Sequence, residues 1–191
     1  MKTHISPAIR LTLVMLVLLA VIYPLVVAGI AKLAPGGGDG EKLTVNGGTA
    51  SRKVVGYALI GQKFTQDRYF NSRPSAVDYN AAGSAGSNKG PSNPDYLKTL
   101  QVRIDTFLVH NPGVAKADIP AELVTASGSG LDPDLSPAGA KIQVARIAKI
   151  RTIPVARLNQ LVDQHTKSPL LGLFGPPTVN VLKLNIALDA L

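Results

Sequence analysis

A charge-free apolar run near the start of the chain limits what this chain can fold into. Residues 11–31 read LTLVMLVLLAVIYPLVVAGIA, with Arg10 before the run and Lys32 after it. As a helix this run would be roughly 31 Å long, close to the thickness of the hydrocarbon core of a bilayer. Backbone groups inside lipid must be paired within their own segment, so a single membrane-spanning helix is predicted over residues 11–33. Pro24 lies late in the run and is expected to kink the helix.

A cleaved signal peptide is the alternative interpretation of the same run. Lys2 and Arg10 could form its charged region, and the sequences at 26–28 and 29–31 resemble cleavage sites. The run is longer than the usual apolar core of a signal peptide, which favours a retained anchor. The expected layout is a cytoplasmic tail at 1–10 and an extracytoplasmic remainder, although the basic residues flanking the run barely decide the orientation.

The rest of the chain is predicted to be an α+β domain at residues 54–191, after a glycine-rich linker at 34–53. Ser136 is predicted to cap one of its helices, with Pro137 at the first helical position. The expected elements are a strand at 54–63, an irregular stretch at 64–94, a helix at 94–109, a strand at 122–126, helices at 137–151 and 154–165, and a closing strand at 179–189.

Composition excludes several functions. The chain has no cysteine, so it has no disulfide framework, thiolate metal site or cysteine nucleophile. Its net charge is +8, but the basic residues are scattered and aromatic residues make up only 5%. These features argue against a nucleic-acid partner. The three histidines, His4, His110 and His165, do not have the spacing of metal ligands.

The stretch GSAGSNKGPSNPD at residues 83–95 has the composition of a phosphate-binding loop but not its order. Lys89 is followed by Gly90 and Pro91, whereas a P-loop needs a serine or threonine directly after its lysine. Irregular stretches as long as 64–94 are usually functional or disordered. Tyr69 and Tyr79 offer apolar anchors here, together with Phe70, so an ordered surface loop is predicted.

A serine hydrolase or binding protein, anchored in the membrane, is the alternative function. Its candidate residues are Ser127, Ser129 and Asp132, in the sequence TASGSGLDPD. Thr125 occupies the position of the first glycine of a G-x-S-x-G elbow, so the hydrolase motif is missing. Asp132 and Asp134 are too few ligands for a calcium loop. A turn-rich lead into the helix cap at Ser136 is the simpler interpretation.

Three long segments carry a resemblance to a known family. They are GQKFTQDRYFNSRPSAVDYNAAGSAGSNKGPSNPD at 61–95, PAELVTASGSGLDPDLSPAGAKIQVARIAKIR at 120–151 and VNVLKLNIALD at 179–189. They closely resemble the C subunit of Kdp-type potassium-transporting P-type ATPases. The chain departs from the familiar pattern at SAGSN, where SGGSN is usual, and at GPPTVNV. The single membrane helix and the chain length agree with that family.

The resemblance implies an accessory subunit of a high-affinity, ATP-driven potassium uptake pump in the bacterial inner membrane. Its implied partners are a channel-like A subunit, a P-type ATPase B subunit, a small F peptide and the lipid bilayer. The subunit is expected to have no catalytic machinery, metal or cofactor of its own, because the complex handles ATP and potassium. The family is also described as a catalytic chaperone that raises the ATP affinity of the B subunit.

The resemblance assigns roles to particular residues. Gln143 corresponds to a glutamine proposed to bind nucleotide, whereas the predicted topology, with ATP in the cytoplasm, favours a helix-surface or interface residue at this position. The remaining family residues are expected to face a partner or to hold the structure together. They are Tyr69, Phe70, Arg73, Pro74, Ser75, Tyr79, Asn80, Ser87, Asn88, Gly90, Pro91, Asn93, Pro94, Ser127, Gly130, Asp132 and Pro133.

Overall fold

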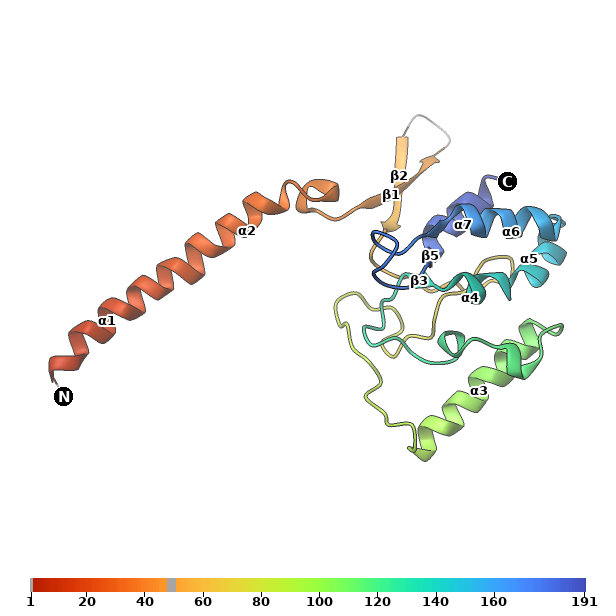
Figure 1. Ribbon diagram of the computed structural model, residues 1–191, viewed down its shortest axis with the longest axis horizontal. Helices are drawn as coiled ribbons and strands as arrows, with labels where there is room; N and C mark the ends of the chain where they lie inside the picture. Colours follow the sequence, from red (N-terminus) through yellow and green to blue (C-terminus); the bar gives the residue numbers. More distant parts are fainter. Residues whose placement is uncertain (1, 48–50) are drawn as a thin grey trace. The chain divides into compact units, whose positions relative to one another are not determined.

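The computed structural model describes residues 2–47 and 51–191 and divides into two units, Met1–Lys42 and Leu43–Leu191 (Figure 1). The first unit is dominated by one long helix, and the second mixes helices with small sheets. The predicted combination of an apolar N-terminal helix with a mixed helix and sheet domain is therefore confirmed.

The long helix consists of α1 (Lys2–Val17), a π-helical turn η1 (Leu18–Ile22) and α2 (Tyr23–Ala31). Its stretch His4–Ala31 is long and apolar enough to cross a membrane. The predicted disturbance at Pro24 takes the form of the π turn, in which the Tyr23 amide donates to the Leu18 carbonyl five residues back. The wider turn makes room for a proline ring that would otherwise clash with the carbonyl four residues earlier.

The stretch expected to be a linker, 34–53, contains regular structure. A 3₁₀ turn, η2 (Pro35–Gly38), follows the long helix. The strands β1 (Lys42–Gly47) and β2 (Ser51–Tyr57) then pair in a two-stranded sheet. The strand predicted at 54–63 therefore starts earlier, at Ser51, and ends at Tyr57, and residues 42–47 of the expected linker form a strand of their own.

The core of the second unit lies between a three-stranded antiparallel sheet and four helices. Its strands are β3 (Asp134–Leu135), β5 (Thr178–Asn180) and β4 (Thr166–Lys167), in the order β3-β5-β4. Its helices are α4 (Pro137–Lys141), α5 (Val144–Arg151), α6 (Val155–Gln164) and α7 (Val181–Asp189). Side chains buried to 2% exposure or less include Phe70, Leu135, Val144, Ile147, Leu158, Val162, Val179, Val181, Leu184 and Leu188.

Helix α3 (Pro94–His110) confirms the helix predicted at 94–109. The Asn93 side chain caps it by accepting from the amides of Asp95 and Tyr96. Two short 3₁₀ turns follow, η3 (Lys116–Asp118) and η4 (Ala121–Leu123). The strand predicted at 122–126 is wrong, because the Thr125 amide and hydroxyl both donate to the Ala121 carbonyl and close a turn.

The closing strand predicted at 179–189 is also wrong beyond its first residues. Strand β5 ends at Asn180, whose side chain accepts from the Lys183 amide and caps α7. Val181, Leu184 and Leu188 then point inward at helical spacing. Thr178, Val179 and Val181 are β-branched and indicated a strand. The cap at Asn180 instead ends the strand, and the inward-facing side chains follow helical spacing from Val181 onward.

The two remaining helix predictions are confirmed with one change. The helix predicted at 154–165 is α6. The helix predicted at 137–151 begins at the Ser136 cap as expected but divides into α4 and α5 at Ile142 and Gln143. Gln143 uses its side chain inside the domain, as described below.

Candidate partner-binding loop

Residues 61–93, named here the wrapped segment, contain neither helix nor strand in the structure. A buried backbone without secondary structure must still pair its N–H and C=O groups. At the start of the segment these groups are paired by side chains from the helices. Arg151 Nε donates to the Arg68 carbonyl at 2.9 Å, and Arg146 Nη2 donates to the Tyr69 carbonyl at 3.0 Å.

Two buried amide side chains pair with the next two residues. Asn185 Oδ1 accepts from the Phe70 amide at 2.9 Å, and its Nδ2 donates to the Phe70 carbonyl at 3.0 Å. Gln143 Oε1 accepts from the Asn71 amide at 2.8 Å, and its Nε2 donates to the Asn71 carbonyl at 3.1 Å. A primary amide offers an acceptor and a donor side by side, as a peptide group does. These side chains therefore replace a neighbouring strand.

Gln143 makes two further hydrogen bonds and is only 1% exposed. Its Nε2 donates to the Gly139 carbonyl at 3.0 Å, and its Oε1 accepts from Arg146 Nη2 at 2.8 Å. The interpretation of Gln143 as a helix-surface residue is therefore wrong. Its side chain joins α4 and α5 to the wrapped segment.

Arg146 brings a buried positive charge into the same cluster. Burial lowers the pKa of its guanidinium, and Asp67, which lies 3.3 Å from Nη1, opposes that shift. His110 Nδ1 contacts the same carboxylate at 2.8 Å. Asp67, His110 and Arg146 line a cavity of about 570 Å³ at the C-terminal end of α3.

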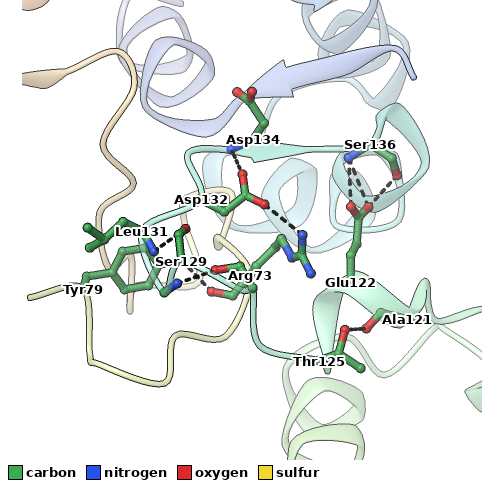
Figure 2. A network of polar contacts seen from close by, with 12 residues as sticks. Arg73, Tyr79, Ala121, Glu122, Thr125, Ser129, Leu131, Asp132, Asp134 and Ser136 are labelled. Atoms are coloured by element: carbon green, nitrogen blue, oxygen red, sulfur yellow. Dashed lines mark hydrogen bonds and ion pairs between the residues drawn. The ribbon is translucent and has the colours of Figure 1, made fainter. Parts of the chain in front are cut away.

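The second part of the wrapped segment rests on the turn at residues 127–132 (Figure 2). Arg73 Nη1 donates to Asp132 Oδ2 at 2.8 Å, while Asp132 Oδ1 accepts from the Asp134 amide at 3.0 Å. The Tyr79 hydroxyl donates to the Arg73 carbonyl. Burial is the main reason that the pKa of Tyr79 is raised above its ordinary value.

Ser75 and Gly130 join the wrapped segment to the turn at residues 127–132. Ser75 Oγ donates to the Gly130 carbonyl at 2.7 Å and accepts from the amides of Val77 and Tyr79. Gly130 has a φ of +68°, and a Cβ there would lie 2.6 Å from Val77 Cγ2. The Ser127 amide also donates to the Pro74 carbonyl. Only glycine fits at position 130 without displacing the segment.

The serines proposed for the alternative hydrolase serve this turn. Ser127 is 5% exposed, and its Oγ accepts from the Gly130 amide. Ser129 Oγ accepts from the Leu131 amide. No hydrogen bond joins either hydroxyl to a histidine or lysine within the described residues 2–47 and 51–191. The interpretation of 127–137 as a turn-rich lead into a helix cap is confirmed.

The cap itself is tied back to η4. Ser136 Oγ accepts from the Gly139 amide and donates to Glu122, whose carboxylate also accepts from the Ser136 amide (Figure 2). A Cβ at Gly139 would lie 2.2 Å from Glu122 Oε1. The carboxylate thus occupies the space that a side chain at 139 would fill.

The family residues therefore fall into two groups. Those at 69–79 and 127–133 come together in the interior network, and Pro133 joins it through its carbonyl, which accepts from the Val181 amide. Asn80 accepts from the Ala82 amide at the edge of that network. The others lie farther along the chain. The outer span, residues 87–92, carries Ser87, Asn88, Gly90 and Pro91, and Asn93 and Pro94 follow it at the start of α3. Ser87, Asn88, Gly90, Pro91 and Pro94 are exposed.

Asn71, Glu122, Arg146 and Asn185 act in the network but were not singled out from the sequence. Asn185 gave one usable indication, because helical spacing places it with Leu184 and Leu188 on the inward face of α7. A buried polar side chain needs a hydrogen-bond partner. A helix predicted at 181–189 would therefore have marked Asn185 as a residue that binds another segment. The other three show no local pattern, since each has a partner 14 or more residues away: Ser136 for Glu122, Gln143 for Asn71, and Asp67 and Tyr69 for Arg146.

Comparison with known proteins identifies the family of this chain. Residues 5–190 match the family described as KdpC: K+-transporting ATPase, c chain. A potassium-transporting ATPase KdpC subunit from Flavobacterium johnsoniae is 59% identical over 183 residues, covering 96% of each chain. One from Bacteroides fragilis is 50% identical, covering all of this chain and 98% of the relative. One from Bacillus cereus is 46% identical, covering 100% and 97%. The chain therefore belongs to the KdpC family of potassium-transporting ATPase subunits.

Proposed function

We propose that this chain stabilises an assembled, ATP-driven potassium uptake pump, with α1–α2 as its retained anchor in a bacterial inner membrane. The mixed domain lies outside the cytoplasm, next to a channel-like subunit, and the complex also contains a P-type ATPase subunit and a small peptide. The subunit brings no cofactor, and ATP and potassium are handled by its partners. The outer span of the wrapped segment, residues 87–92, is the surface that a partner contacts.

One observation carries this proposal: the outer span is exposed but fixed at both ends. Before it, Ser84 Oγ donates to the Ser129 carbonyl at 2.9 Å, and Gly86 lies against Gly128. After it, Asn93 caps α3. A segment held in this way offers backbone and side-chain polar groups to a partner at little cost in ordering. Among the described residues, no hydrogen bond engages the side chains of Asn88 or Lys89.

The proposal includes the ATP-affinity effect that the family resemblance implies, as an indirect effect. The Gln143 side chain makes four hydrogen bonds inside the domain. Direct contact with a nucleotide would break them and leave the Asn71 backbone unpaired, which is costly in a buried site. We therefore assign the effect to the assembled complex, through which the accessory domain biases the ATPase subunit.

The test is the double substitution Asn88→Gly with Lys89→Ala in the complete pump, because glycine tolerates the φ of +52° at position 88 whereas alanine would be strained there. Recovery of the complex after affinity purification and potassium uptake in whole cells are expected to fall together. Removing two exposed side chains should leave the unfolding temperature of the purified full-length chain within about 1 °C of the original, since surface changes usually cost little stability.

A matched control is Gln160→Ala with Lys167→Ala, which removes two exposed polar side chains elsewhere on the domain. This control should leave both recovery and uptake unchanged. Normal recovery of the Asn88 and Lys89 variant with reduced uptake would place the outer span in the ion path and contradict an assembly role.

A further inference from the structure

The loop between β4 and β5 exposes four large apolar side chains. Leu170, Leu171, Leu173 and Phe174 are 67%, 82%, 82% and 63% exposed. They belong to the sequence SPLLGLFGPP at 168–177, which contains no charged residue. Isolated exposed leucines are ordinary, but a contiguous apolar surface of this kind marks an interaction site. Residues 169–175 are named here the apolar turn.

The apolar turn has a fixed shape. Leu170 and Phe174 exchange backbone hydrogen bonds of 2.9 and 3.0 Å, and the Leu173 amide donates to the Leu170 carbonyl at 3.1 Å. The turn is carried by β4 and β5, which pair Thr166 with Val179. The exposed side chains are therefore held on a closed hairpin rather than on a loose loop.

The residue at the tip is unusual for its conformation. Leu171 and Gly172 have φ values of +54° and +73°. Tight hairpin turns with two positive φ angles favour asparagine followed by glycine, because a branched side chain is strained in the left-handed region. Leucine is conformationally unfavourable at this position, and it gives the turn an exposed apolar tip. Strained backbone conformations of this kind are found most often at functional sites.

We propose that the apolar turn is a preformed anchor that inserts into an apolar pocket on another subunit of the same pump. Membership of the KdpC family implies partner subunits, and this proposal rests on the proposed role in assembly while naming a second contact surface. A fixed shape reduces the ordering cost of docking into a shaped protein pocket. Anchors of this type, buried at the centre of an interface, carry much of its affinity.

Lipid is the less suitable occupant of this surface. A fluid bilayer has no shape to match, so a strained and preformed tip would bring no advantage there. Segments that lie in the membrane interface usually combine apolar residues with tryptophan, tyrosine or basic residues. Residues 168–177 contain none of these.

The decisive substitution is Leu171→Asn, because it separates the fold from the contact. Asparagine tolerates the left-handed conformation, so the full-length chain is expected to unfold at the same temperature or higher. Loss of an apolar anchor should weaken recovery of the pump complex about tenfold or more. The control is Leu59→Asn, at an equally exposed leucine outside the turn, and should leave recovery unchanged.

Because the chain has no cysteine, Leu173→Cys can carry a single photo-crosslinking maleimide in the assembled pump. A cross-link to a peptide of another pump subunit is the expected result. Cross-linking only to lipid, or only to a second copy of this chain, would overturn the proposal. Normal recovery of Leu171→Asn would also overturn it, and would leave the role of the outer span standing if the Asn88 and Lys89 variant still fails to assemble.

Discussion

At the scale of single residues, Gln143 and Asn185 show how an irregular segment can be held inside a small domain. Each side chain offers an acceptor and a donor to one residue of the wrapped segment, and both are buried. The identity of the residue matters because only a primary amide supplies both groups in this arrangement. A glutamate or a leucine of similar size would leave a backbone group unpaired.

Gln143→Ala is therefore expected to lower the free energy of unfolding by about 3 kcal/mol, because it removes four hydrogen bonds at a buried side chain and leaves the half-buried Asn71 amide and carbonyl without partners. Chemical denaturation of the full-length chain in detergent measures this change, with the exposed Gln160→Ala as the control. In complexes that do assemble, the KM for ATP should stay unchanged. A variant of normal stability with an altered KM would restore a nucleotide role for Gln143.

Asp134 offers a test by pH. Its pKa is raised chiefly by burial and also by the neighbouring Asp132, while a hydrogen bond from Asn180 opposes the shift. A raised pKa in the folded state means that the contribution of Asp134 is favourable when it is protonated and is lost as pH rises through the folded value. The ionised carboxylate thus costs stability at pH 7.

Asp134→Asn keeps the acceptor for Asn180 and removes the charge. The variant should melt at an equal or higher temperature at pH 7, and its advantage should shrink as pH falls toward the usual aspartate value of 3.8. Melting curves at several pH values check this, with the exposed Asp118→Asn as the control. If the advantage of the variant grew on acidification, the pKa of Asp134 would be lowered in the folded state rather than raised.

At the scale of elements, the wrapped segment and the turn at 127–132 form one interlocking unit. Gly61 and Gly130 mark the closest approaches, since a Cβ at Gly61 would lie 2.5 Å from the Asp132 carbonyl oxygen. The unit is therefore sensitive to a single methyl group at these positions. The outer span is not, because a Cβ at Gly90 would meet nothing within 4 Å.

Gly130→Ala is expected to cost about 3 kcal/mol of unfolding free energy, since it combines a strained positive φ with overpacking against Val77. Gly90→Ala is the matched control and should be nearly neutral. Thermal unfolding of both full-length variants measures the difference. If the two variants were equally stable, the wrapped segment could move aside for an added methyl group at position 130, and the two parts would not be interlocked.

Helices with strong end signals could be predicted from the sequence, and contacts between distant segments could not. Ser136 predicted the start of α4 because a cap is a local property, and the helix predicted from residue 94 starts after a local cap of the same kind, Asn93. The sequence at 179–189 indicated a strand because it begins with two valines, and the asparagine between them, Asn180, did not stand out as a helix cap. The order of residues 68–71 depends on side chains 72 to 115 residues away, which no local pattern reveals.

At the scale of the whole molecule, the two units have contrasting surfaces. None of the most apolar stretch of the helix His4–Ala31 is buried within the structure, as suits a segment that lies in lipid. The second unit keeps its core inside and exposes the outer span and the apolar turn. This division is what a tethered accessory domain requires.

The absence of cysteine makes the predicted topology testable with single introduced cysteines. A membrane-impermeant maleimide added to intact spheroplasts should label Ala156→Cys in α6 and leave Ser6→Cys in the N-terminal tail unlabelled. The intact mass of the purified chain should include residues 11–31. Labelling of the tail alone would reverse the orientation, and a mass beginning after Ala28 or Ala31 would show cleavage.

The pairing of Phe70 with Asn185 has a consequence for biosynthesis. The two residues are 115 positions apart, and Asn185 lies in α7, which is translated long after Phe70. Long-range pairing of this kind cannot form until both partners have been made, so the Phe70 backbone lacks this partner while the residues between them are translated. A message truncated before the codon for Asn185 therefore yields a chain whose middle stays open to proteases.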